Sequence, residues 1–179
     1  MTEQAVAGEW TAPTIERADP PNVANEREAL EGWLDYHRQT LLLKCSGLTG
    51  EQLCRRSVPP SNLSLLGLVR HMAEVERWWM RMCVDGQREL DEIFCTPQTP
   101  NDDFDKVEPE QAAADLACYR SEVDLARAAT AGHGLDETFA GRRHPLDVRW
   151  VYVHMIEEYA RHNGHADLLR ECIDGVTGE

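Results

Sequence analysis

The sequence has few basic residues. Its 179 residues include 18 Lys and Arg against 32 Asp and Glu, which gives a net charge of −14 with histidine neutral. A protein that binds a nucleic-acid duplex needs a basic surface to neutralise phosphates, and an acidic surface is repelled by anionic lipid. We therefore expect neither nucleic acid nor a membrane among its partners.

Long hydrophobic runs are also missing. No apolar stretch approaches the ~18 residues that a bilayer-spanning helix needs. The opening residues, MTEQAVAGEW, contain neither the basic segment nor the apolar segment of a secretory signal. Together these absences predict a cytoplasmic protein.

Paired cysteines and catalytic loop motifs are absent as well. The six cysteines include no CxxC pair, so in a reducing compartment we expect free, buried, small hydrophobic side chains. These residues are Cys45, Cys54, Cys83, Cys95, Cys118 and Cys172. Glycine-rich phosphate loops, nucleotide-binding motifs and the G-x-S-x-G elbow do not occur, which argues against nucleotide enzymes and serine hydrolases.

The dominant pattern in the sequence is the periodicity of amphipathic helices. Residues 1–24 contain three prolines and little periodicity, and predict a tail or strap that Trp10 pins to the body. Apolar residues then recur at three- and four-residue spacing in four segments. These predicted helices span about residues 25–46, 64–84, 109–130 and 147–174. Four long helices without a strand pattern predict an all-α, four-helix bundle over residues 25–175.

The predicted helices are joined by long connectors. Thr49 and Gln52 form a capping-box pattern, which predicts a short helix in the first connector. Residues 85–108 are acidic and contain two prolines, and a loop of this length is often a functional lid. Near the last helix stand Arg142, Arg143 and Arg149, which suit either a solvated turn or an anionic substrate.

The last helix carries an unusual polar cluster. At about 100° per residue, His154, His162 and His165 all lie within about 40° of Glu158. The same face holds the apolar residues Val151, Met155, Leu169 and Cys172. Buried polar groups are costly unless they are paired or bound to metal, so the pattern predicts a compensating partner.

A divalent metal ion is one such partner. Glu158 and His162 are four residues apart, the spacing by which H-E-x-x-H helices present two ligands to one metal. His71 flanks the apolar stripe of the helix over 64–84 and is the best third ligand. This His₂-carboxylate set suits Zn²⁺ above all, and also Ni²⁺, Fe²⁺ or Mn²⁺, with coordination positions left open. His154 and His165 are then candidates to orient ligands or transfer protons. A hydrogen-bonded polar core without metal is the competing explanation.

Two segments resemble a known superfamily. HMAEVERWW (71–79) and HMIEEYARHNGHADLLRE (154–171) look like the signature helices of the DinB/YfiT-like superfamily. WLDYHRQTLLLKCSGLTGEQL and SNLSLLGLVRH are similar to its mini-circle or unknown-function branch. The resemblance covers roughly residues 25–175. It implies a four-helix bundle that holds a divalent metal near one end, and a homodimer. Carried over, the ligand positions are His71, Glu158 and His162.

The resemblance also implies an activity. Many members have His where this chain has Glu158, and Glu at this position is similar to the mycothiol-dependent maleylpyruvate isomerase branch. Members with known activity are metal-dependent enzymes that use low-molecular-weight thiols such as mycothiol. The implied function is a thiol-dependent transferase or isomerase acting on a small electrophilic substrate. A metal-dependent hydrolase and a non-enzymatic metal-binding or small-molecule-binding bundle remain alternatives.

Overall fold

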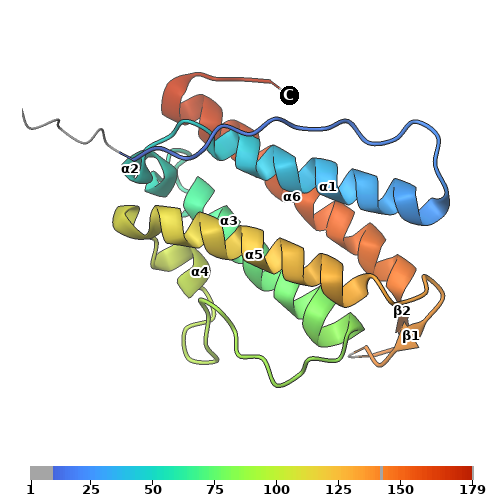
Figure 1. The fold of residues 1–179 in the computed structure, drawn as a ribbon. Coiled ribbons are helices and arrows are strands. Elements are labelled where there is room, and N and C mark those ends of the chain that lie inside the picture. Colours follow the sequence, from blue (N-terminus) through green and yellow to red (C-terminus); the bar gives the residue numbers. More distant parts are fainter. Residues whose placement is uncertain (1–9, 142, 179) are drawn as a thin grey trace, which may run out of the picture.

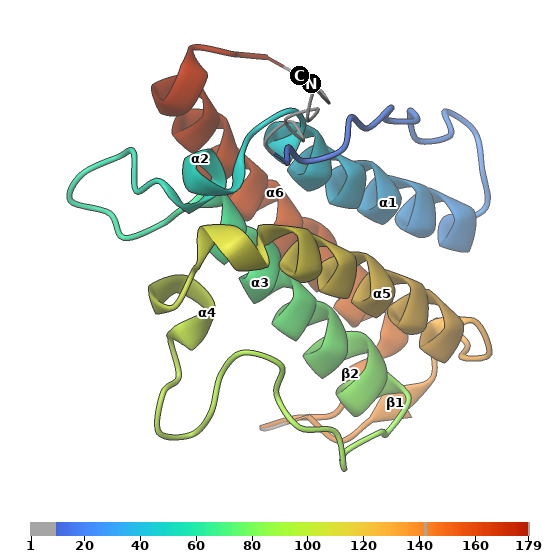
Figure 2. The same ribbon diagram turned by 60° about the vertical axis from the view of Figure 1, so that its left-hand side comes forward.

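Four long helices form the body of the protein. The computed structural model describes residues 10–141 and 143–178. The four are α1 (Glu26–Cys45), α3 (Leu65–Glu76) with its π-helical continuation η1 (Arg77–Val84), α5 (Ala112–Thr130) and α6 (Val148–Asp174). Helix α1 packs along α6, and α3 packs along α5 (Figure 1, Figure 2). The prediction of an all-α bundle is confirmed.

Local capping explains where these helices begin and end. Asn25 and Glu28 form a reciprocal capping box at the start of α1. The side chains of Ser64 and Asp147 accept backbone N–H groups at the starts of α3 and α6. Helix α6 ends at Gly175, whose φ of 79° lies in the left-handed region that favours glycine. These boundaries agree with those predicted from the sequence.

Short elements fill the connectors. Helix α2 (Gly50–Cys54) begins at Thr49 with the predicted capping box to Gln52. A short helix, α4 (Asp102–Asp105), lies inside the 85–108 segment, and η2 (Pro109–Gln111) leads into α5. Strands β1 (Thr138–Phe139) and β2 (Leu146–Asp147) pair antiparallel before α6. The sequence did not predict this hairpin, because two-residue strands are too short to show a period.

The segment before α1 lies along the bundle as a strap, drawn in blue in Figure 1. The backbone N–H of Ala12 donates to the carbonyl of Leu48 at 2.8 Å, and the N–H of Gly47 donates to the carbonyl of Ala12 at 2.8 Å. The side chain of Ala12 is buried, and the Arg17 guanidinium donates to the Thr40 hydroxyl. Residues 1–9 lie outside the described residues, and the domain boundary at residue 24 stays a prediction.

An ionic network crosses the centre of the bundle. Glu76 is fully buried, and its two carboxylate oxygens each accept a 2.7 Å hydrogen bond from the guanidinium of Arg38. The hydroxyl of Tyr159 donates to the same carboxylate at 2.7 Å and lies 2.9 Å from the hydroxyl of Tyr119. Burial raises the pKa of both tyrosines. The network ties α1, α3, α5 and α6 together by charge-assisted bonds.

The arginines of α3 and η1 face α5. Arg70 pairs with Asp115 at 3.0 Å, while Arg77 and Arg81 share the carboxylate of Glu122 at 2.7 and 2.8 Å. The two guanidiniums lower the pKa of Glu122 against the opposing effect of burial. This side of the helix is therefore an ionic interface between two helices.

The cysteines differ in part from the prediction. No disulfide joins any of the six in the described part of the chain, but only Cys45 is buried, and Cys172 is exposed. The expectation of six buried thiols is wrong, because Cys54, Cys83, Cys95 and Cys118 are only partly buried. No helix of residues 10–141 and 143–178 has the length and apolar character that crossing a membrane requires.

Candidate metal centre

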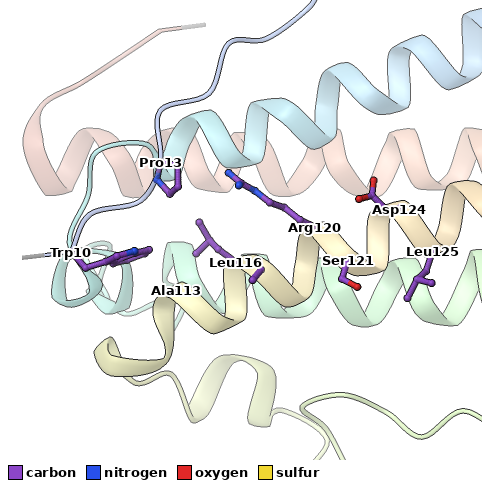
Figure 3. A pocket seen from close by; sticks show the side chains of 9 residues that line it. Trp10, Pro13, Ala113, Leu116, Arg120, Ser121, Asp124 and Leu125 are labelled. Atoms are coloured by element: carbon purple, nitrogen blue, oxygen red, sulfur yellow. The ribbon is translucent and has the colours of Figure 1, made fainter.

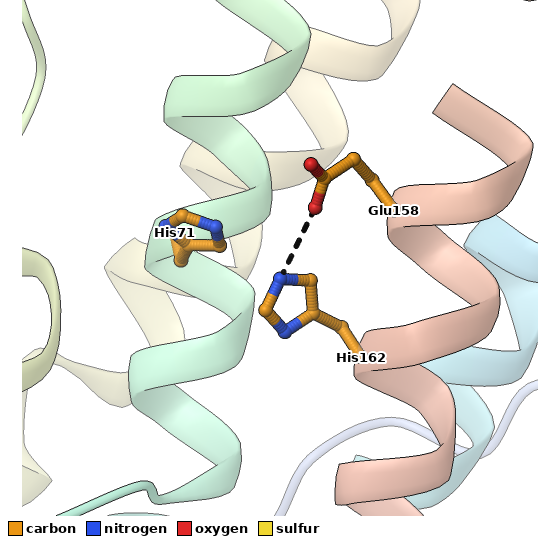
Figure 4. Close-up of side chains that lie close together, drawn as sticks. All are labelled: His71, Glu158 and His162. Atoms are coloured by element: carbon orange, nitrogen blue, oxygen red, sulfur yellow. Dashed lines mark ion pairs between the residues drawn. The ribbon is translucent and has the colours of Figure 1, made fainter. Parts of the chain in front are cut away.

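The three predicted ligands meet between two helices. His71 comes from α3, and Glu158 and His162 come from successive turns of α6 (Figure 4). One potential ligand atom of each residue lies within 4.8 Å of the other two. The packing of α3 against α6 thus brings together residues that are almost ninety positions apart in sequence.

The spacing of Glu158 and His162 suits two ligands of one metal ion and is long for a hydrogen bond. Glu158 Oε2 and His162 Nε2 are 3.4 Å apart, longer than the about 2.7–3.2 Å of a good N–H···O bond. Two ligands that each lie about 2.1 Å from a tetrahedral zinc ion are themselves ~3.4 Å apart. In addition, His162 Nδ1 is buried and has no hydrogen-bond partner among the described residues. The donor set and its separation therefore fit a divalent ion.

The protonation state of His162 suits the same role. Burial is the largest cause that lowers the pKa of His162 to about 4, and the neighbouring His71 and His165 contribute to the same shift. The side chain is consequently neutral at physiological pH. A neutral imidazole is the form that binds metal, so no proton must leave His162 first.

His71 has a buried carboxylate partner. Its Nδ1 lies 2.9 Å from Oδ2 of Asp103, whose residue is 4% exposed. A carboxylate that accepts from Nδ1–H fixes the tautomer and leaves Nε2 available to a metal. Sequence reasoning missed Asp103, because it lies in the 85–108 segment with several other acidic residues. From the sequence, Asp103 was visible only as one acidic residue within a predicted connector that has no helical register.

His154 and His165 lie on either side of the ligand pair along α6. His154 Nε2 is 3.6 Å from Glu158 Oε1, and its ring stacks on Trp150 with centroids 4.9 Å apart. The ring of His165 is 5.5 Å from that of His162, and its Nδ1 is buried without a partner among the described residues. His154, Glu157 and Glu158 form a second possible ligand group, but the Glu157 residue is exposed.

The orientation of α6 corrects one prediction. We expected the cluster at the centre of the buried face, but the Glu158 and His162 side chains are 21% and 13% exposed. The buried residues of α6 are Val148, Val151, Tyr152, Met155, Tyr159, Asn163, Ala166 and Leu169. At about 100° per residue their mean direction lies about 80° around the helix from Glu158. Helix α6 turns that face mainly toward α1, which leaves the cluster on the flank that meets α3.

The 85–108 segment forms one wall beside the cluster. A cavity of about 370 Å³ includes His71 and Trp79 on one side and Cys95 and Pro100 on the other. One carboxylate oxygen of Glu74 accepts the backbone N–H groups of residues 93–95 at 2.6–3.0 Å, which anchors the segment to α3. The segment therefore lies beside the candidate site, in a position suited to a lid. Its movement remains a prediction.

Another groove belongs to a different part of the surface. It has a volume of about 610 Å³ and lies between the strap residues Trp10 and Pro13 and α5 (Figure 3). None of the predicted site residues lines it. Trp10 lines this groove and is 38% exposed, and its role in pinning the strap stays a prediction.

The fold and the cluster together define a class of protein. A four-helix bundle that presents a His₂-carboxylate group between α3 and α6 is a DinB-like bundle, as the signature helices predicted. Residues 29–175 match the family of mycothiol-S-transferases, and the chain belongs to that family. No curated protein was found to match the chain.

Proposed function

We propose that this protein transfers mycothiol to a small electrophilic molecule at a divalent metal held by His71, Glu158 and His162. The observation that carries the proposal is the convergence of three ligand atoms within 4.8 Å in a chain of the mycothiol-S-transferase family. Zinc fits the two imidazoles and one carboxylate, and nickel, iron or manganese accept the same donors.

The bound metal would supply Lewis acidity, which lowers the pKa of the thiol and favours the thiolate nucleophile. The chain contributes charge and orientation. Glu158 supplies one negative charge, and His162 binds as a neutral ligand because its pKa is low. Asp103 accepts a hydrogen bond from Nδ1–H of His71, so that Nε2 of His71 is left to bind the metal.

The two histidines that flank the ligand pair have separate roles, one in proton transfer and one in ligand orientation. In the transfer, a sulfur–carbon bond forms, the electron pair of the leaving group or double bond departs from that carbon, and the thiol proton passes to a base. His154 is suited to take this proton because its Nε2 lies 3.6 Å from Glu158 and its ring is fixed between Trp150 and Trp79. His165 packs on His162 and orients that ring.

The test combines metal analysis with an assay of mycothiol consumption. Protein purified without a polyhistidine tag should hold one divalent ion per chain and consume mycothiol together with an electrophile. His162→Ala should lose both the ion and turnover, and Glu158→Gln should lower occupancy. His133→Ala is the matched control: His133 lies outside the cluster, paired with Asp85 and Glu137, and its loss should change neither.

Four outcomes would contradict the proposal. Protein exposed to zinc, nickel, iron and manganese that binds none of them would indicate a hydrogen-bonded polar cluster. Turnover without any thiol would indicate a hydrolase, and metal binding without turnover would indicate a non-enzymatic bundle. Full metal content in His162→Ala with loss in His154→Ala or His165→Ala would move the ligand set one turn along α6.

Family membership also supports a small-molecule substrate. We further propose a homodimer in the cytoplasm, as the superfamily resemblance and the sequence imply. Sedimentation of the purified protein and fractionation of cells that produce it will test these two points.

A further inference from the structure

A large cavity lies beside Trp79, between η1 and the connector that joins β1 to β2, and Arg88 of the 85–108 segment also lines it. Its volume is about 810 Å³. Trp78, Trp79 and Cys83 of η1 form one side, and the connector between β1 and β2 forms the other. Phe139 and Leu146 add apolar surface. A cavity of this size with aromatic walls is typical of a small-molecule site.

The charge of this cavity is opposite to that of the chain. The described residues of its wall that can carry a positive charge are Arg88, Arg143 and His144, and no acidic residue lines it. The chain as a whole has a net charge of −14. By contrast, the 370 Å³ cavity that also includes Trp79 is lined by three acidic residues, Glu74, Glu92 and Asp103, and by Arg77, which pairs with Glu122. The positive wall is therefore a local feature, and it favours an anionic ligand.

The two arginines are also uncommitted within the protein. The other arginines near this end of the bundle are paired: Arg77 and Arg81 with Glu122, and Arg149 with Glu26 and Asp136. Across residues 10–141 and 143–178, neither Arg88 nor Arg143 makes an ion pair. Arg142 lies outside the described residues. A planar guanidinium without an internal partner is well suited to bind a carboxylate by two hydrogen bonds.

Trp79 connects this cavity to the candidate metal centre. Its ring lies 4.8 Å from the ring of His154, and His154 Nε2 lies 3.6 Å from Glu158. Trp79 also lines the cavity that contains His71. A molecule that rests against Trp79 thus contacts a side chain that also touches His154 and that also lines the cavity containing His71.

We propose that this cavity binds the electrophilic cosubstrate, and that this cosubstrate is a carboxylate with an apolar or aromatic body. The proposal rests on the proposed transferase function for the role of the ligand. Its body would pack on Trp79, Phe139 and Leu146, while Arg88 and Arg143 bind its carboxylate at the rim.

Binding can be tested without any reaction. Cinnamate and the neutral cinnamamide have the same aromatic body, so titration calorimetry with both isolates the effect of charge. Cinnamate should bind at least about tenfold more tightly than cinnamamide, since hydrogen bonds to charged groups are worth this much or more. Arg143→Gln and Arg88→Gln should each remove most of that preference. Arg55→Gln makes the same charge change at an exposed residue after α2 and should leave the preference intact. Equal affinity for acid and amide, or equal loss in Arg55→Gln, would overturn the proposal.

Turnover then tests the assigned role. Chlorodinitrobenzoate and chlorodinitrobenzamide of the same substitution pattern react with a thiolate by the same step: a sulfur–carbon bond forms, chloride leaves with its electron pair, and the thiol proton is released. Arg143→Gln should raise KM for the benzoate about tenfold, as an anchoring bond is lost, with kcat little changed. It should not change KM for the benzamide, and Arg143→Lys should restore part of the loss.

The two proposals fail in different ways. If neither compound consumes mycothiol but cinnamate binding depends on Arg143, the transferase function fails while the carboxylate site stands. If both compounds are consumed with a KM that is insensitive to Arg143→Gln, the transferase function stands and the carboxylate site is wrong.

Discussion

The imidazole of His71 and the buried carboxylate of Asp103 lie 2.9 Å apart, so a residue of the 85–108 segment holds a candidate metal ligand. The preceding residue of α3, Arg70, reinforces this contact. The Arg70 guanidinium donates to the backbone carbonyls of Asp102 and Asp103 at 3.0 Å each. Consequently, α4 is fixed to α3 through both main chain and side chain.

Replacing Asp103 should therefore weaken metal binding without removing a ligand. Asp103→Asn keeps a hydrogen-bond acceptor but loses the negative charge, and we expect an about tenfold loss of affinity, at the lower end for partners of metal-bound histidines. Competition with a zinc chelator measures the change. Asp105→Asn, an exposed residue of the same short helix, is the control. Unchanged affinity in Asp103→Asn would show that the contact has no role in metal binding.

Glu74 should control how firmly the 85–108 segment is held. Its carboxylate accepts three consecutive backbone N–H groups, so Glu74→Ala removes the anchor at residues 93–95. Limited digestion with trypsin should then cut faster after Arg88 and Lys106. Glu89→Ala, an exposed position in the same segment, should leave the rate unchanged.

The same digestion tests the lid. If the segment closes over the site, metal and mycothiol together should slow cleavage of the unmodified protein. Cleavage at the same rate with and without them would make the segment a fixed wall.

Glu76 should be essential for stability. Glu76→Gln removes the buried carboxylate from Arg38, which keeps only the partly exposed Asp35 as a charged partner, and removing one member of a buried pair costs about 3–5 kcal/mol. Urea denaturation should show this as a lower midpoint. Glu157→Gln breaks an exposed ion pair with Arg161 and should cost less than about 1 kcal/mol. Equal midpoints for the two variants would mean that Arg38 finds another partner.

His133 should titrate above its usual range. Hydrogen bonds to Asp85 and Glu137, at 3.2 and 3.0 Å, raise its pKa from 6.5. Because the folded state binds this proton more tightly, the contribution to stability is full below pH 6.5 and is lost as the pH rises through the raised pKa. An NMR titration measures the pKa directly. Asp85→Asn should lower it, whereas Glu89→Gln should not; a pKa at or below the usual value would contradict the ion pairs.

Local sequence signals account for the helices and for two of the three candidate ligands. Caps at Asn25, Ser64 and Asp147 and the stop at Gly175 are local signals, since each depends on residues within one turn. The pairing of Glu158 with His162 is equally local, because a four-residue spacing fixes their relative position on any helix. His71 was predicted from its place beside the apolar stripe of the helix over 64–84, and the family resemblance implied the same ligand.

The way in which those helices face one another depends on tertiary packing. The direction of the buried face of α6, about 80° from Glu158, depends on packing against α1 and not on its own periodicity. Asp103 reaches His71, and Arg38 reaches Glu76, across 32 and 38 positions of sequence. Such contacts form only when burial makes an unpaired charge costly, so the choice of partner belongs to the folded bundle as a whole.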